Sequence, residues 1–206
     1  MLLWPGLVLS VGGLACLAVD RRASHALHEH VRVGFWHLLD ATTHAAKASH
    51  WLIVAGAAFV VGEVSRRLWG ENADLELIRQ CALAFVASLA AGSLVLHGIK
   101  LVLGRRRPRD DFEMGLYGFM PLSFDLQYNS FPSGHALTIM CVAVVASAAW
   151  PQFALLWFAL ALWLALTRAL LTAHYLSDVF VGAGIGLISA REIVVHVFPQ
   201  LAPSWF

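Results

Sequence analysis

The chain has 206 residues, of which 59% are hydrophobic and 13% are charged, and its formal net charge is +1 at pH 7. Soluble domains carry about 25% charged residues, so this composition excludes an ordinary water-facing surface, and a mean hydropathy of +0.71 favours a protein embedded in lipid. The near-zero net charge and the absence of an arginine-rich arm argue against nucleic acid as a partner.

Apolar runs along the chain predict six transmembrane helices. Backbone groups in lipid must be hydrogen-bonded within their own segment, and about 20 residues are needed to cross a bilayer. Pro151 separates the fourth run from the fifth and predicts a tight turn, because proline ends one helix and can start the next. The expected fold is an all-α, polytopic membrane protein, a bundle of six transmembrane helices that forms one domain over residues 1–206. The runs are roughly 2–19, 50–68, 79–99, 135–150, 152–171 and 178–198.

The first run is expected to be a retained membrane helix. No basic residue precedes it, and Asp20-Arg21-Arg22 follows it, which differs from a cleaved signal, although Gly13-Leu14-Ala15-Cys16 faintly resembles a lipoprotein signal. The three cysteines lie in apolar stretches without metal-ligand spacing, so we interpret them as small apolar residues. They are Cys16, Cys81 and Cys141.

Residues 20–49, between the first two runs, are rich in histidine. The spacing is loose, and neither cysteine nor a dense carboxylate set accompanies it, so an interfacial amphipathic helix is favoured over a metal cluster. The histidines are His25, His28, His30, His37 and His44, with His50 at the boundary.

Three clusters of ionisable residues lie beside the predicted membrane helices, where charge is costly and is therefore often functional. The first begins at Lys100 and ends at Arg107-Pro108, directly after the third run. Taken alone, it is equally typical of a basic juxtamembrane anchor.

The second cluster, from Ser130 to Ala136, opens the fourth helix with Pro132-Ser133-Gly134-His135. Ser133 is a natural N-cap, Gly134 lets a ligand approach the backbone closely, and free amides at a helix start attract phosphate. An ordinary capped helix with an incidental histidine is the alternative.

The third cluster holds Arg168, His174 and Asp178. His174 and Asp178 are four residues apart and so share one helix face. A carboxylate there can accept a hydrogen bond from one ring nitrogen and leave the other as a lone-pair donor. A purely structural His–Asp pair is the alternative.

Six alternating spans would bring all three clusters to the same side of the membrane. Together they supply three cations, a helix N-terminus, two histidines and an orienting aspartate. Phosphoryl transfer needs these parts: cations for the phosphate oxygens, a nucleophile, and an acid for the leaving group.

The three clusters resemble the signature of the type 2 phosphatidic acid phosphatase (PAP2) superfamily, which includes bacterial membrane lipid phosphatases. That signature is Lys, six residues, Arg-Pro; then Pro-Ser-Gly-His; then Ser-Arg, five residues, His, three residues, Asp. The matching segments run from Lys100 to Pro108, from Pro132 to His135 and from Thr167 to Asp178, with every spacing kept and Thr167 in place of serine.

The resemblance implies a role for each matched residue. His174 would be the nucleophile and form a phosphohistidine, Asp178 would orient it, and His135 would protonate the leaving lipid oxygen and then deprotonate the attacking water. No metal or other cofactor is expected, since the cations neutralise the phosphate. The phosphate-binding residues would be Lys100, Arg107 and Arg168, with amides near Ser133 and Gly134.

The implied function is metal-independent hydrolysis of a phosphomonoester or diphosphate lipid, with the lipid and the bilayer as partners. Candidate substrates are phosphatidylglycerol phosphate, phosphatidic acid, undecaprenyl diphosphate and lipid A phosphates. A lipid phosphotransferase that uses the same phosphohistidine is the main alternative. Six spans oppose a soluble haloperoxidase-like vanadate site, and a non-enzymatic channel or scaffold leaves the motif spacing unexplained.

The resemblance also implies a multi-pass protein of the bacterial inner membrane whose active site faces the periplasm. The distribution of basic residues outside the motifs is neutral or slightly adverse to this orientation. Arg21, Arg22, Arg32 and Lys47 would be periplasmic, whereas Arg66, Arg67 and Arg79 would be cytoplasmic.

Two weaker predictions concern the segments that flank the site. Residues 43–51 resemble an element that precedes the second helix in many bacterial PAP2 phosphatases, so Lys47 either faces the headgroup or is a snorkelling anchor. Residues 109–131 combine acidic and aromatic side chains, and we predict a lid at the lipid boundary in which Phe119 and Tyr128 set headgroup preference.

Overall fold

The protein is described by a computed structural model that covers residues 1–31, 33–70, 72–122 and 126–206. Its regular secondary structure in these residues consists of helices, and the β-pairing there is limited to isolated bridges at Arg105. This confirms the predicted all-α fold. The α-helices are α1 (Leu3–Cys16), α2 (Asp20–His30), α3 (Val33–Thr43), α4 (Ala48–Trp69), α5 (Ala73–Leu103), α6 (Pro108–Met114), α7 (Gly134–Ala149), α8 (Ala154–Leu170) and α9 (Leu176–His196). Short 3-10 turns are η1 (His44–Ala46), η2 (Leu126–Tyr128), η3 (Pro151–Phe153) and η4 (Pro199–Leu201).

Each of the six predicted spans lies in a helix, but the helices differ in length. Among the described residues, four helical stretches are long and apolar enough to cross a membrane: α4, α5, α8 with the preceding turn, and α9. Helix α1 has 14 residues and meets α2 at 86°, so this bent pair counts as a fifth crossing only if it is one broken span. Helix α7 has 16 apolar residues. The count of six is therefore approximate: four full spans and two shorter apolar helices form the bundle.

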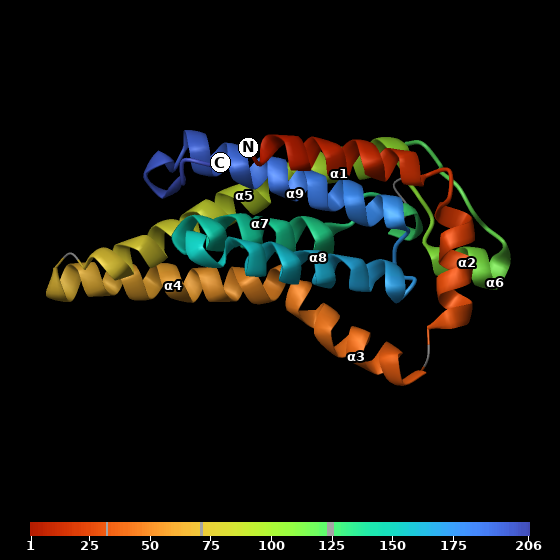
Figure 1. Ribbon diagram of the computed structural model, residues 1–206, viewed down its shortest axis with the longest axis horizontal. Coiled ribbons are helices and arrows are strands. Elements are labelled where there is room, and N and C mark those ends of the chain that lie inside the picture. The colour runs from red at the N-terminus through yellow and green to blue at the C-terminus, as the bar shows by residue number, and fades with distance from the viewer. Residues whose placement is uncertain (32, 71, 123–125) are drawn as a thin grey trace.

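Helix α9 lies at the centre of the bundle, between α1 and α7 and against α5 (Figure 1). Gly182 and Gly186 are four residues apart on the face that meets α7, and a Cβ at either would collide with backbone of Ser133 or Leu137. The missing side chains let the two backbones approach closely. This contact fixes the start of α7 against the start of α9, where two of the three sequence clusters lie.

The histidine-rich segment is not one interfacial helix. It forms α2 and α3, two short helices at the end of the bundle near α6, and η1 leads from them into α4 (Figure 1). Arg32, which entered the comparison of basic residues, lies outside the described residues. Within the described residues, no three His, Cys, Asp or Glu side chains gather as a metal-binding group.

The segment proposed as a lid is tied to the backbone that follows α5. Met120 donates its amide hydrogen to Gly104 O, and Arg105 exchanges backbone hydrogen bonds with Tyr128 and Ser130. Phe119 packs edge-on against Phe131. These contacts favour a structural role for Phe119, while its predicted effect on headgroup preference stays a prediction. Phe124 and Asp125, in the same segment, lie outside the described residues.

Candidate active site

Four helix ends meet at the end of the bundle that carries α2 and α6 (Figure 1). They are the last turns of α5 and α8 and the first turns of α7 and α9. Beside them lies a cavity of about 540 Å³, which is lined by α4, α5 and α7 and by His174 in the turn between α8 and α9. Five of the eight predicted site residues line this cavity: Lys100, Arg107, Gly134, His135 and His174. The structure therefore brings residues from all three sequence clusters to one place.

The cations on the cavity wall come from different elements. Lys100, in the last turn of α5, donates from Nζ to Asn129 O at 2.7 Å. Arg107 precedes α6, and burial together with nearby Arg109 lowers the pKa of its guanidinium below the ordinary value, which is so high that the group stays cationic. Lys47, at the start of α4, also lines the cavity. A dianionic phosphate would be attracted into this space.

Arg168 shapes the turn that carries His174. Its carbonyl accepts the amide hydrogens of Ala173 and His174, which closes the turn between α8 and α9. Its Nη1 donates to Thr43 Oγ1 at 3.2 Å, and Thr167 donates to the same hydroxyl at 3.0 Å. The serine-to-threonine departure at position 167 thus keeps a hydroxyl that connects α8 to the end of α3.

Ser133 occupies the N-cap position of α7, but the prediction that it caps the helix is wrong. Among the described residues, the Ser133 side chain makes no capping hydrogen bond to α7. The Ser133 backbone amide donates to Asp178 O at 2.9 Å. Its Oγ is buried without a hydrogen-bond partner among the described residues, as is Nε of Arg168. A buried polar atom without a partner costs about 1–3 kcal/mol. Both atoms therefore lack an intramolecular partner among the described residues, and the first amides of α7 have no acceptor within the helix.

His174 is 5% exposed, and its Nδ1 lies 3.5 Å from Asp178 Oδ2 and 3.4 Å from Ser130 Oγ. Burial lowers the pKa of the His174 imidazole, Asp178 opposes this, and the positive charges of Arg168 and Arg107 lower it further. The net direction is downward, which favours the neutral ring. A proton on Nδ1, facing Asp178, leaves the lone pair on Nε2.

Sequence reasoning missed Arg105, which lies behind His174 and Asp178. Its side chain is fully buried and donates from Nη1 to Asp178 Oδ1 at 2.6 Å and from Nη2 to Asp20 Oδ2 at 2.8 Å. Asp20 in turn accepts from the Ser177 amide at 3.0 Å. The guanidinium also lies 4.0 Å from the centroid of the Tyr175 ring. Asp20 and Arg105 thereby connect the start of α2 to Asp178.

Asp178 is surrounded by donors, so its carboxylate has a fixed position. Besides Arg105, Ser130 Oγ donates to Oδ2 at 2.6 Å and the Tyr175 amide donates to the same oxygen at 2.9 Å. A carboxylate held by several hydrogen bonds cannot turn away from the imidazole. The arrangement therefore keeps the Asp178 carboxylate beside the His174 ring.

A family model described as the PAP2 superfamily matches residues 81–201, which contain all eight predicted site residues. The chain belongs to the PAP2 superfamily. The predicted resemblance is thus confirmed by a match that covers more than half of the chain.

Two curated relatives are lipid A 1-phosphatases from Rhizobium etli and Rhizobium johnstonii. Each is 34% identical to this chain over 93 residues, which is 45% of this chain and 40% and 38% of the respective relatives. The chain therefore matches less than half of the length of these proteins.

Two solved structures have the same fold. A transmembrane PAP2-type phosphatidylglycerolphosphate phosphatase from Bacillus subtilis superposes with a TM-score of 0.63 at 18% identity, covering 100% of this chain and 97% of that chain. LpxE from Aquifex aeolicus gives a TM-score of 0.60 at 16% identity, covering 86% of this chain and 96% of that chain. Together with the apolar helices, these likenesses identify an integral membrane protein of the PAP2 fold.

Proposed function

We propose that the protein is a lipid phosphatase that works through a phosphohistidine on His174. The observation that carries the proposal is the placement of His174 and His135 on one cavity wall with Lys100 and Arg107, while Asp178 lies behind His174. Two histidines and two cations, of the kinds that phosphoryl transfer uses, thereby line one cavity.

In the first step, Nε2 of His174 attacks phosphorus, and the bond from phosphorus to the lipid oxygen breaks. His135 donates a proton to that oxygen, so the lipid leaves as an alcohol or, from a diphosphate, as a monophosphate. The imidazole becomes positively charged, and the Asp178 carboxylate stabilises this charge.

In the second step, water attacks the same phosphorus and the bond from phosphorus to His174 breaks. His135, now neutral, accepts the proton from the water, so free phosphate leaves and both histidines return to their first state. Lys100, Arg107 and Arg168 hold the phosphate oxygens throughout, together with the first amides of α7 and the Ser133 hydroxyl. No step requires a divalent cation, because three fixed cations already compensate the phosphate charge.

The substrate class is a membrane lipid with a terminal phosphate, and the rhizobial relatives favour lipid A 1-phosphate within that class. The test is phosphate release by the purified protein from lipid A, phosphatidylglycerol phosphate, phosphatidic acid and undecaprenyl diphosphate. We expect free phosphate from at least one lipid and none with His174→Ala. Transfer of the phosphate to a second lipid without free phosphate would identify a phosphotransferase instead, and inertness toward all four lipids would refute the proposal.

We further propose that the protein lies in the bacterial inner membrane with the site facing the periplasm. Both termini lie at the end of the bundle away from α2 and α6, so this orientation places them in the cytoplasm (Figure 1). A fluorescent protein that folds only in the cytoplasm should fluoresce when it is fused to the C-terminus. A C-terminal fusion that stays dark, together with a C-terminal fusion to a periplasm-only reporter enzyme that is active, would show the opposite orientation.

A further inference from the structure

Lys47 is a cation of the active-site cavity that the mechanism does not use. It lines the cavity together with Lys100 and His135, although it belongs to none of the three sequence clusters. Its side chain is half-buried, and its ammonium group has neither an ion-pair partner nor a hydrogen-bond acceptor within the described residues. Because like charges repel at short range, a cation placed among other cations is stabilised most by an anion that enters the cavity.

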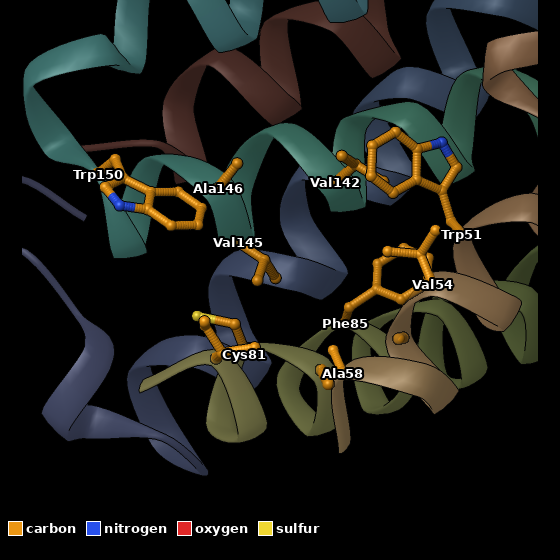
Figure 2. Close-up of a pocket in the computed structure, with 12 residues that line it drawn as sticks. Trp51, Val54, Ala58, Cys81, Phe85, Val142, Val145, Ala146 and Trp150 are labelled. Atoms are coloured by element: carbon orange, nitrogen blue, oxygen red, sulfur yellow. The ribbon is translucent and has the colours of Figure 1, made fainter. Parts of the chain in front are cut away.

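The backbone that carries Lys47 is fixed by packing on both sides. Ala46, directly before it, is fully buried against α7 and α8. Trp51, one turn after it, donates from Nε1 to Ala45 O at 2.7 Å. Figure 2 shows the Trp51 ring reaching from α4 toward α7, where Val142 lies. These contacts hold the start of the Lys47 side chain in place relative to α7.

Lys47 lies on the side of the cavity from which the leaving group departs. An in-line displacement places the leaving oxygen opposite the attacking Nε2 of His174, and the proposed acid for that oxygen is His135. The positive charge of Lys47 acts on the His135 imidazole. A substrate bound for in-line attack therefore presents its leaving part toward Lys47.

A phosphoryl group in the leaving part would need a cation of its own. Lys100, Arg107 and Arg168 are assigned to the oxygens of the transferred phosphate. Lysine suits a further phosphoryl group, because its ammonium is a compact charge with three rotatable donors. Ser49, in the first turn of α4, also lines the cavity and adds a hydroxyl donor.

We propose that Lys47, assisted by Ser49, binds a second phosphoryl group that belongs to the leaving part of the substrate. The assignment rests on the proposed lipid phosphatase function and divides its candidate substrates. Undecaprenyl diphosphate has this group directly on the breaking bond, phosphatidylglycerol phosphate has it across a glycerol, and phosphatidic acid lacks it. In lipid A 1-phosphate the breaking bond leads to a sugar, so Lys47 contributes little there.

For a lipid diphosphate, the assignment adds one role to the first step. The bond from the terminal phosphorus to the bridging oxygen breaks, and its electron pair stays on that oxygen. His135 supplies the proton, and the departing lipid monophosphate keeps its own negative charge. Lys47 compensates this charge until the product leaves.

The kinetic test compares farnesyl diphosphate with farnesyl monophosphate, which differ only in the second phosphoryl group. Lys47→Gln should lower kcat/KM for the diphosphate relative to the monophosphate about tenfold or more, the effect of losing a hydrogen bond between charged groups. Lys47→Arg keeps the charge and should largely restore the ratio. Arg22→Gln is the matched control, because it removes an exposed cation of α2, at the same end of the bundle but outside the cavity lining, and should leave the ratio unchanged. Equal losses on both substrates for Lys47→Gln, as expected of a membrane anchor, or no loss on either, would overturn the proposal.

A second pair of substrates distinguishes the two sources of the phosphoryl group. Phosphatidylglycerol phosphate has a phosphodiester in its leaving part, and phosphatidic acid with the same acyl chains does not. A selective loss on phosphatidylglycerol phosphate in Lys47→Gln supports a subsite that reaches across the glycerol. A selective loss on farnesyl diphosphate alone supports a subsite for the group on the breaking bond.

A binding test separates the subsite from the catalytic proposal. Isothermal titration calorimetry on His174→Ala protein compares inorganic pyrophosphate with inorganic phosphate, so no turnover is needed. Pyrophosphate should bind more tightly, and adding Lys47→Gln should weaken pyrophosphate about tenfold or more while changing phosphate little. Equal weakening of both anions, or no preference for pyrophosphate, would refute the subsite. If the preference depends on Lys47 but wild-type protein hydrolyses no lipid, the subsite stands and the catalytic proposal fails.

Discussion

Replacing Arg105 by methionine should destabilise the protein, because Arg105 is the cation between two buried carboxylates. Asp20, Arg105 and Asp178 are each fully buried, and the two ion pairs are 2.8 and 2.6 Å long. Removing one partner of a buried ion pair costs about 3–5 kcal/mol, since the remaining charge is left uncompensated. Arg105→Met leaves two such charges, so we expect a loss of unfolding free energy at or above that range, together with lower kcat as Asp178 loses its fixed position.

The assay is reversible unfolding in mixed micelles, with Arg109→Ala as the matched control. Arg109 is an exposed neighbour with one pair, 3.6 Å from Asp110, and such surface pairs contribute about 0–1 kcal/mol. A second variant, Arg105→Met combined with Asp20→Asn, removes one charge of each sign and leaves the buried network with one net negative charge, as in the wild type. It should recover about 0.5–3 kcal/mol relative to the sum of the single effects. A loss for Arg105→Met no larger than that for Arg109→Ala, or strict additivity in the double variant, would refute the reasoning.

Three further predictions concern the chemistry. His135→Ala should lower kcat/KM for alkyl phosphates about 100-fold or more while barely changing it for p-nitrophenyl phosphate, whose leaving group needs no acid, and equal losses would remove His135 from the acid role. kcat/KM should fall as the pH is lowered, because His174 is proposed to attack as the neutral ring. Burial lowers the pKa of His174, so this acid limb should lie below the ordinary histidine value of about 6.5, and an acid limb above pH 7 would contradict the proposed role. Activity should survive EDTA and be inhibited by vanadate, whereas complete loss on chelation, restored by magnesium or zinc, would overturn the cation assignment.

Much of the site could be predicted because its residues lie at helix ends, and helix ends can be located from apolar runs. Gly134, His135, His174 and Lys100 line one cavity as the topology requires. The expected spans agree with the helices within a few residues, apart from α5, which begins six residues earlier than predicted, at Ala73. Periodicity places an apolar segment reliably, but a polar first turn, such as Asn72-Ala73-Asp74 at the start of α5, carries no hydropathy signal.

The contacts of Arg105 and Ser133 could not be predicted, because each depends on how distant segments pack. Three arginines follow one another at 105–107, and nothing local distinguishes the one that is buried from the one that faces the cavity. Asp20 was interpreted only as the polar flank of the first run, although it pairs with Arg105 85 residues away. Ser133 has the side chain of an N-cap, but its amide bonds to Asp178 because Gly182 and Gly186 draw α9 close to α7. The one sequence signal for Asp20 was its position as a polar residue at the end of an apolar run.

If phosphate passes through a covalent bond to His174, the protein gains the mass of one phosphoryl group during turnover, and mass spectrometry can measure this gain. His135→Ala should form the phosphoenzyme from p-nitrophenyl phosphate but hydrolyse it slowly, because the base that activates water is missing. The account predicts a burst of about one p-nitrophenol per protein and one added phosphoryl group on His174 in acid-free mass spectrometry. Adding His97→Ala, from the same cavity wall, to the His135→Ala variant is the matched control and should leave the label on His174. Absence of the burst and of any phosphoryl adduct, or an adduct on another residue, would contradict the account.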